Sequence, residues 1–431
     1  AGAGRPRERK RDSAVILGTG ASFVCNWSFK DFAGSIFPWG IRHVGLGRPV
    51  PKDVMLAYRN FAFLARRPEP HYQPPEAALL LPDGNRFGAY AGPMLNALYA
   101  SITALIRLGV PFHVINEDDL ATAQMPARAL LWPCPYSVDD DAFARVLAFV
   151  RNGGHLYLSG SVGFSADRRP DRLERAALLG LPEMTMTPPF PATAPTASRP
   201  TLRATVHRGA VWYEPEPIEI RRPERLRDTY RRFLDASGVA RSGVKPDDAI
   251  DAPFRLPTKS GELLVIVRTD GGDKTFQATV GGVRLTLSLR GRAPAMVWVE
   301  QGRLRAASLK GTLDAIDNDG VGRAMLGCTG LAAVAALGED EDACDLRAGT
   351  AILVLPFEPG VVSLTTPRPA DAVCLLGDIR DGRWHTLRRE ALPPHEAVRV
   401  DEETYLDLRL VCGTVSTATA VKLAERWASG R

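Results

Sequence analysis

Residues 128–160 read RALLWPCPYSVDDDAFARVLAFVRNGGHLYLSG, and they decide the fold class of the first half of this chain. An apolar run is followed by a segment whose apolar residues recur at helical spacing, and a second apolar run comes after it. Aspartates begin the helical segment, Arg151 lies in its last turn, and Gly153-Gly154 end it, as the helix dipole and helix-stop signals favour. Strand, helix and strand at this spacing predict a βα unit of a parallel sheet.

The same alternation extends in both directions over residues 77–243. We expect strands at AALLLP (77–82), PFHVINEDD (111–119), HLYLSGSVG (155–163) and GAVWYEPEPIEI (209–220), and helices at NALYASITALIRLG (96–109) and RDTYRRFLDASG (227–238). Residues 165–205 are rich in Pro, Thr and Arg and predict a long irregular insertion.

The pattern changes near residue 250, where short segments with partial period-two alternation begin. They include ELLVIVRTD (262–270), VRLTLSLRG (283–291), AMVWVEQG (295–302), AILVLPFEPG (351–360) and TYLDLRLVC (404–412), separated by Gly-rich turns. Many short strands with regular turn signals predict an antiparallel β-sandwich over residues 250–431. One apolar interruption, MLGCTGLAAVAALG (325–338), fits either a strand plus helix or a buried hairpin.

Composition excludes several classes of function. The 431 residues carry 54 basic and 49 acidic side chains, a net charge of +5, with Arg interleaved among Asp and Glu, so no basic reading face for nucleic acid is predicted. No apolar run reaches the roughly 18–20 residues that span a membrane. No secretory signal is visible either, and the six scattered cysteines form no C-x-x-C pair, so we expect a cytoplasmic protein with reduced thiols and no metal or cofactor.

The first residues divide at a proline-rich linker, 66–76. Residues 1–12 are basic and low in complexity, and we expect a disordered leader. Residues 13–27, SAVILGTGASFVCNW, predict a strand or helix end, a tight turn and a buried parallel strand, followed by a loop rich in aromatic residues. Residues 53–65 have apolar positions at helical spacing behind Asp53, a suitable N-cap.

Three stretches in this order resemble the β-galactosidase-type glycoside hydrolases that carry a trimerisation domain. GASFVCNWSFKDF (20–32), with FPWGIRH (37–43) after it, looks like the eighth strand of the catalytic barrel and its loop. LLPDGNRFGAY (80–90) opens a region that follows the order of the trimerisation domain. RGRAPAMVWVEQGRLRAAS (290–308) and ILVLPFEPGVVSL (352–364) look like the β domain.

The resemblance implies a fold of class α/β plus all-β. Residues 13–70 would be the remnant of a (β/α)8 barrel, its last βα unit, and residues 77–243 a flavodoxin-like domain similar to class I amidotransferases. It places the two catalytic glutamates before residue 13, so we expect no catalytic residue in this chain. Trp27 and Trp39 become candidate sugar-binding residues, with Lys30 and Asp31 on the same loop. The implied partners are a carbohydrate, two further copies in a homotrimer, and an upstream barrel polypeptide.

Two other readings stay open: a stand-alone amidotransferase-like hydrolase, and a carbohydrate-binding scaffold protein. The first needs a cysteine nucleophile, and Cys134 follows a predicted strand. Prolines flank Cys134 on both sides, which does not suit the tight turn of a nucleophile elbow, so we interpret it as a structural thiol. Ser159 and Ser161 follow the next strand, but LSGSVG is not a G-x-S-x-G elbow.

Overall fold

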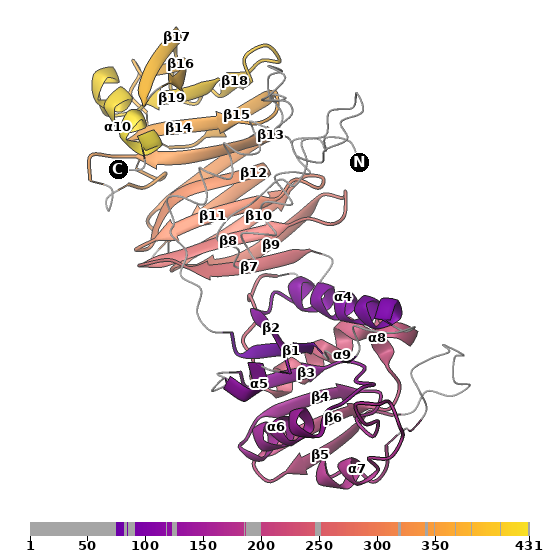
Figure 1. Cartoon of the computed structure of the whole chain (residues 1–431). Coiled ribbons are helices and arrows are strands. Elements are labelled where there is room, and N and C mark those ends of the chain that lie inside the picture. Colours follow the sequence, from indigo (N-terminus) through magenta and orange to yellow (C-terminus); the bar gives the residue numbers. More distant parts are fainter. Residues whose placement is uncertain are drawn as a thin grey trace, which may run out of the picture. The chain divides into compact units, whose positions relative to one another are not determined.

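The computed structural model describes residues 75–81, 84, 91–117, 119–122, 127–184, 186, 200–245, 251–317, 320–340, 344–348, 350–366, 368–380, 382–405 and 407–429. These residues fall into two compact units, an α/β unit within Gln73–Ser242 and a β unit within Gly243–Arg431. Figure 1 shows the two units.

The α/β unit is built on a six-stranded sheet in the order β2-β1-β3-β4-β6-β5. Five strands are parallel and β5 is antiparallel to β6, so the α/β prediction for this region is confirmed as a mostly parallel sheet. The parallel strands follow one of the common doubly wound orders. The strands are β1 (Ala77–Leu81), β2 (Phe112–Asn116), β3 (Ala129–Trp132), β4 (His155–Ser159), β5 (Leu202–Val206) and β6 (Gly209–Glu214). The helices are α4 (Ala91–Arg107), α5 (Asp119–Thr122), α6 (Asp140–Arg151), α7 (Glu174–Leu178), α8 (Ile218–Arg221) and α9 (Pro223–Ala236).

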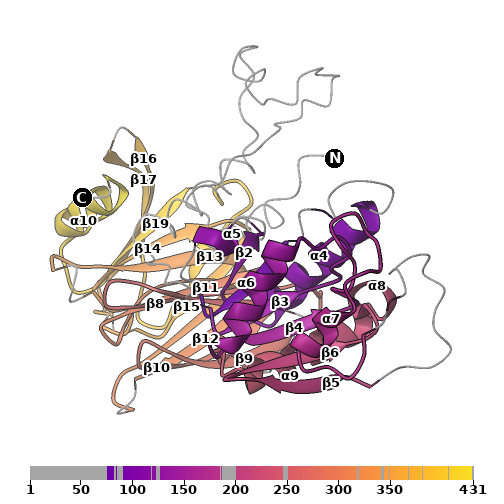
Figure 2. The ribbon, with the colours of Figure 1, turned by 60° about the horizontal axis from the view of Figure 1, so that its bottom comes forward.

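Alternation along the strands divides the core between two faces of this sheet. Leu156 and Leu158 of β4 pack with Val146 of α6 on one face. On the other face Tyr157 contacts α9, with ring centroids 5.7 Å from Phe233. Figures 1 and 2 show α6 and α9 on opposite sides of the strands.

The helix predicted within residues 128–160 is α6, and its cap explains where it begins. The Asp139 carboxylate accepts hydrogen bonds from the backbone N–H groups of Asp141 and Ala142, at 2.8 and 3.4 Å. These two donors are among those that a helix start leaves unpaired. At the other end Gly153 has φ +108°, a conformation that glycine adopts without strain.

The expectation of an irregular insertion at 165–205 is wrong at both ends of that range. Residues 174–178 form α7, and Leu202–Val206 forms β5, which pairs with β6 at the edge of the sheet. Arg203 of β5 lies over the indole of Trp212, with its guanidinium carbon 3.7 Å from the ring centroid. This cation–π contact covers the Trp212 ring near the edge of the sheet. The charged residues of the short strand β5 leave no regular apolar alternation in the sequence, which is why this strand was not predicted.

The β unit contains one network of 13 antiparallel strands that divides into two branches. The strands are β7 (Ala252–Pro257), β8 (Gly261–Val267), β9 (Lys274–Val280), β10 (Val283–Leu289), β11 (Ala295–Glu300), β12 (Arg303–Ile316), β13 (Arg323–Leu337), β14 (Ala351–Pro356), β15 (Gly360–Leu364), β16 (Val373–Arg380), β17 (Arg383–Ala391), β18 (Val398–Val400) and β19 (Leu408–Cys412). A large antiparallel β region therefore follows the α/β unit, as predicted.

Two long strands make the branch point. The first half of β12 pairs with β11, and its second half pairs with β10. Likewise β13 pairs with β15 through its first half and with β14 through its second half. The pairing changes at Gly311, where φ is +133° and the register of β12 against β13 shifts. Residues of both branches, such as Leu287 and Val354, share one hydrophobic cluster.

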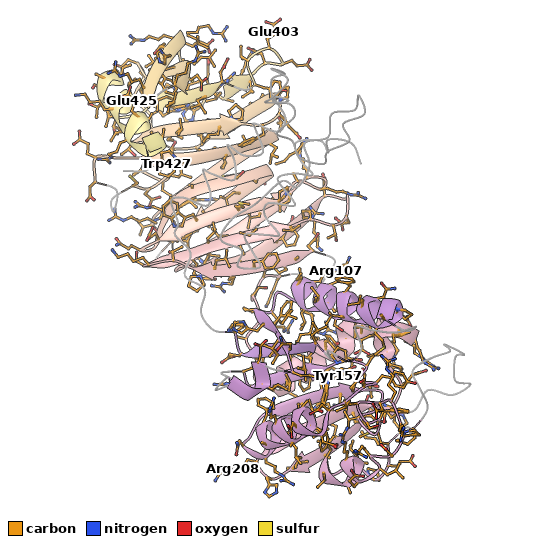
Figure 3. The ribbon with its side chains drawn as sticks, in the orientation of Figure 1. Arg107, Tyr157, Arg208, Glu403, Glu425 and Trp427 are labelled. Atoms are coloured by element: carbon orange, nitrogen blue, oxygen red, sulfur yellow. The ribbon has the colours of Figure 1, made fainter. Side chains whose placement is uncertain are left out.

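Two sequence interpretations of this unit need correction or completion. The stretch 325–338 lies almost wholly within the single strand β13, so neither a strand plus helix nor a buried hairpin is correct. The all-β expectation omitted the C-terminal helix α10 (Thr417–Ser429). On α10, Glu425 accepts a hydrogen bond from the backbone N–H of Trp384 at 2.7 Å, and Trp427 lies 6.4 Å from Trp298 between ring centroids (Figure 3). Among the described residues, no helix has the length and apolar character needed to cross a membrane.

Candidate functional site

A buried carboxylate lies at the carboxyl edge of the parallel sheet, where open α/β folds hold their ligands. Cys134 comes two residues after β3 and Ser159 is the last residue of β4. Glu219 belongs to α8, shortly after β6 ends. Three successive neighbouring strands thus deliver a thiol, a hydroxyl and a carboxyl group to one point.

Glu219 is the acceptor on which this cluster converges. Its Oε2 accepts a hydrogen bond from Ser159 Oγ at 2.7 Å. Its Oε1 accepts from the hydroxyls of Tyr157 and Tyr230, each at 3.0 Å. The Ser101 hydroxyl lies 2.8 Å from the Tyr230 oxygen, so helix α4 joins the same network. Figure 3 labels Tyr157 in the interior of this unit.

Cys134 touches the cluster through both its backbone and its side chain. Its N–H donates to Ser159 Oγ at 3.0 Å, and its Sγ lies 3.5 Å from Glu219 Oε2. The residue has φ +52°, in the left-handed region that non-glycine residues rarely adopt. The flanking prolines therefore do not prevent a sharp turn at Cys134, so the expectation that they are unsuited to such a turn is wrong.

Electrostatics make the Cys134 thiol a poor nucleophile at neutral pH. Burial raises the pKa of the Cys134 thiol well above its usual range, and the neighbouring Glu219 adds to the shift. A reactive cysteine needs the opposite shift, because the thiolate is the nucleophile. Burial also raises the pKa of Glu219, against the hydrogen bonds from Ser159, Tyr157 and Tyr230 that lower it.

The cluster is closed by its own side chains. Cys134 is 1% exposed, Glu219 4% and Ser159 0%. It connects β3, β4 and α8 with helices α4 and α9 through buried hydrogen bonds, each of which strengthens in a low dielectric. The arrangement therefore links these five elements through the Glu219 carboxyl group, which is a structural role.

The sequence predicted some of these positions and missed others. Cys134 and Ser159 lie in the cluster, while Ser161 lies outside it and accepts a hydrogen bond from the Gly163 N–H at 3.1 Å. The central Glu219 was missed, although a glutamate within the apolar stretch GAVWYEPEPIEI is a visible signal of a buried charge. The predicted sugar-binding residues Trp27, Lys30, Asp31 and Trp39 all lie outside the described residues. In the described part of the chain, no group of His, Cys, Asp and Glu side chains is arranged to hold a metal ion.

No protein-family model matches this chain, and no curated protein matches it either. Structural matches to GH42 β-galactosidases cover between 53% and 63% of the chain. The β-galactosidase from Bacillus circulans sp. alkalophilus is similar over 62% of this chain and 48% of its own, at 12% identity and TM-score 0.45. That from G. stearothermophilus, a catalytic mutant, is similar over 56% and 43%, at 13% identity and TM-score 0.41.

A rhamnosidase from Novosphingobium sp. PP1Y is similar over 95% of this chain and 42% of its own, at 14% identity and TM-score 0.41. The chain thus resembles parts of glycoside hydrolase structures, and it spans less than half the length of each of these three.

Proposed function

We propose that this chain is the C-terminal, non-catalytic and oligomer-forming portion of a glycoside hydrolase acting on β-galactoside-like sugars. In this proposal the α/β unit is an amidotransferase-like trimerisation domain and the β unit is a β-sandwich tail. Residues 13–70 are the last βα unit of a (β/α)8 barrel, and the catalytic glutamates belong to an upstream barrel polypeptide. The sequence motifs of the three stretches support the family.

The observation that carries the non-catalytic role is the closed state of the Glu219 cluster. An enzyme of this fold would hold its reactive groups open at the carboxyl edge of the sheet. Here that edge holds a thiol and a carboxyl group that are both nearly inaccessible. The raised pKa of the Cys134 thiol favours its protonated form, which suits a structural connection better than nucleophilic attack.

One observation favours the alternative of a stand-alone amidotransferase-like hydrolase. The positive φ of Cys134 after a parallel strand is the backbone geometry of a nucleophile elbow. Burial and the direction of the thiol pKa oppose this alternative, because an attacking cysteine needs exposure and a lowered pKa. The two readings differ in whether Cys134 turns over a substrate.

An activity assay separates these readings. We expect the purified chain to be inactive on chromogenic β-galactosides and on glutamine. A Cys134→Ala variant and the unchanged chain should then give the same rate as buffer. Turnover that disappears in Cys134→Ala would reject the non-catalytic role and establish the alternative.

Oligomerisation is tested by the mass in solution. Tyr99 on α4 is 61% exposed and Val114 on the edge strand β2 is 47% exposed, so a trimer contact on the α/β unit could bury these apolar side chains. Light scattering should give the mass of a trimer, and Tyr99→Ser with Val114→Ser should lower it. Leu387→Ser, at a 57% exposed position of the β unit, is the matched control and should leave the trimer intact. A monomer at micromolar concentration would reject the proposal.

The sugar-facing role of Trp27 and Trp39 is tested only once a barrel is completed. With the upstream polypeptide added, Trp27→Ala and Trp39→Ala should raise the KM for a β-galactoside, because an indole that stacks on the sugar is lost. Lys30→Ala and Asp31→Ala should have smaller effects of the same sign. An unchanged KM in all four variants would remove this loop from the site.

A further inference from the structure

A small cavity of about 120 Å³ lies within the β unit, beside the strands β16, β17, β18 and β19. Its floor is one face of a three-strand stretch. Arg388 of β17, Leu376 of β16 and Arg409 of β19 are directly paired neighbours across these strands. Cross-strand neighbours project to the same side of a sheet, so both arginines face the cavity. Cys374 and Glu390 lie two residues further along the same strands.

Arg409 is a buried cation that has only neutral hydrogen-bond partners. The residue is 2% exposed. Its Nη1 donates to the carbonyl oxygens of Thr404 and Asp407 at 2.7 and 2.6 Å, and its Nη2 donates to the Thr404 hydroxyl at 2.8 Å. Within the described residues it has no ion-pair partner. A buried charge without an opposite charge in contact is costly, and burial lowers the pKa of this guanidinium accordingly.

Three arginines and two glutamates line the cavity, and Asp401 lies beside it, with its Oδ2 3.7 Å from Arg388 Nη2. Glu390 is held by Arg388, whose Nε lies 2.5 Å from its Oε1. Arg399, on β18, also lines the cavity and is exposed. Glu396 also lines the cavity, so two arginines, Arg399 and Arg409, face one carboxylate that is not held in this pair.

Arg368 extends the positive region beside the cavity. Its Nη2 donates to the backbone carbonyl of Glu396 at 2.7 Å. Its Nε and Nη1 are buried and have no hydrogen-bond partner in the described part of the chain. Buried guanidinium donors without acceptors are rare in native proteins, because each unmade bond costs free energy.

We propose that this cavity is a binding site for a small oxyanion, with Arg409 at its floor and Arg399 at its rim. A carboxylate, phosphate or sulfate group supplies the negative charge that Arg409 lacks among its contacts, and arginine recognises such groups by paired hydrogen bonds. The cavity volume of about 120 Å³ is enough to hold one such group.

Calorimetry on the full chain tests the proposal with inorganic phosphate, with sulfate and with glucuronate, against glucose as the neutral control. We expect saturable binding of at least one oxyanion and none of glucose. Phosphate or sulfate alone identifies a free inorganic anion or phosphate ester as the source, and glucuronate identifies an acidic sugar. Arg399→Ala should weaken binding about tenfold or more by removing a charge-assisted bond. Arg383→Ala, an exposed position on β17 that does not line the cavity, should leave it unchanged.

Two further readouts keep the test decisive. Cys374 lines the cavity, so a bound anion should slow alkylation of this thiol in the native chain. Arg409→Met should abolish binding, and where that variant fails to fold, Arg399→Ala and Arg388→Ala decide. The absence of saturable binding by all three anions would overturn the proposal. So would equal affinities in the unchanged chain and in the Arg399→Ala and Arg388→Ala variants, or binding of glucose as strong as that of glucuronate.

Discussion

Replacing Glu219 by glutamine is the sharpest test of the buried cluster, because it keeps the volume and changes one acceptor oxygen into a donor. In the native cluster Oε1 accepts from two tyrosines and Oε2 accepts from Ser159. Whichever way the new amide turns, one set of hydroxyl donors faces an N–H group. At least one buried donor then loses its acceptor, which costs about 1–3 kcal/mol. That is about a five- to 150-fold increase in the constant for local opening.

The Cys134 thiol reports this opening directly. It is buried, and it is the only cysteine of the tryptic peptide 129–145, so alkylation of the native chain followed by mass spectrometry isolates it. We expect Glu219→Gln to accelerate alkylation of Cys134 by the factor above. Glu174→Gln, at an exposed position on α7, is the matched control and should change nothing. Equal alkylation rates in both variants would refute the view that Glu219 holds the cluster together.

The direction of the Glu219 pKa shift predicts how the effect of Glu219→Gln on Cys134 alkylation depends on pH. Burial raises the folded-state pKa of Glu219 above its unfolded value, so the folded chain binds this proton up to a higher pH than the unfolded chain does. The associated stability is present below the unfolded pKa and is lost as pH rises through the folded pKa. Glutamine does not titrate, so the difference in stability between the two proteins should narrow as pH rises through the folded-state pKa of Glu219. A difference that widens would contradict the sign of the shift.

Arg175→Met should destabilise the α/β unit by about 1–3 kcal/mol, because the buried backbone carbonyls of Val162 and Phe164 lose their hydrogen-bond donor. Hydrogen bonds from Arg172 and Arg175 lower the pKa of the exposed Asp140 carboxyl group to about 2. The part of the stability that comes from these ion pairs is therefore lost as pH falls toward 2, and an acid titration by circular dichroism should show a smaller loss in the variant. Gly311→Ala places a methyl group 1.9 Å from a carbonyl oxygen of β10, so it should destabilise the β unit by about 1–3 kcal/mol or more and lower its thermal midpoint. Gly327→Ala is the control, because its nearest neighbouring atom is 3.7 Å away, and it should leave the midpoint unchanged. Burial raises the pKa of Cys374 to about 12, so its alkylation in the native chain should stay slow at mildly alkaline pH, and fast labelling would contradict this.

Local signals explain what the sequence could predict of the fold. The α6 cap and its flanking strands lie within one stretch of residues, so spacing and capping chemistry are readable without knowing the tertiary structure. Helix α10 was missed although Ala420, Leu423, Ala424 and Trp427 have helical spacing, because the preceding strands favoured continued alternation. The long strand β13 was left undecided because small apolar residues such as Ala332 and Ala333 suit both helices and strands.

The candidate site was less predictable because its contacts are distant in sequence. Ser101 and Tyr230 are 129 positions apart, and Ser159 and Glu219 are 60 apart. Sequence spacing within one element says nothing about such pairs, which depend on the order of the strands. What the sequence did contain was Cys134 after a strand, and burial then determined that its thiol is structural.

Strands β12 and β13 belong to both branches of the β unit, and this has a consequence for how the unit folds. They are consecutive, with only residues 317–322 between Ile316 and Arg323, so their pairing is local and costs little loop-closure entropy. Once this hairpin has formed, each half of it offers a template edge: β11 and β14 add to one half, and β10 and β15 to the other. We expect the hairpin to be the folding nucleus of the unit, with φ-values highest along it and falling toward the outer strands β7 and β17.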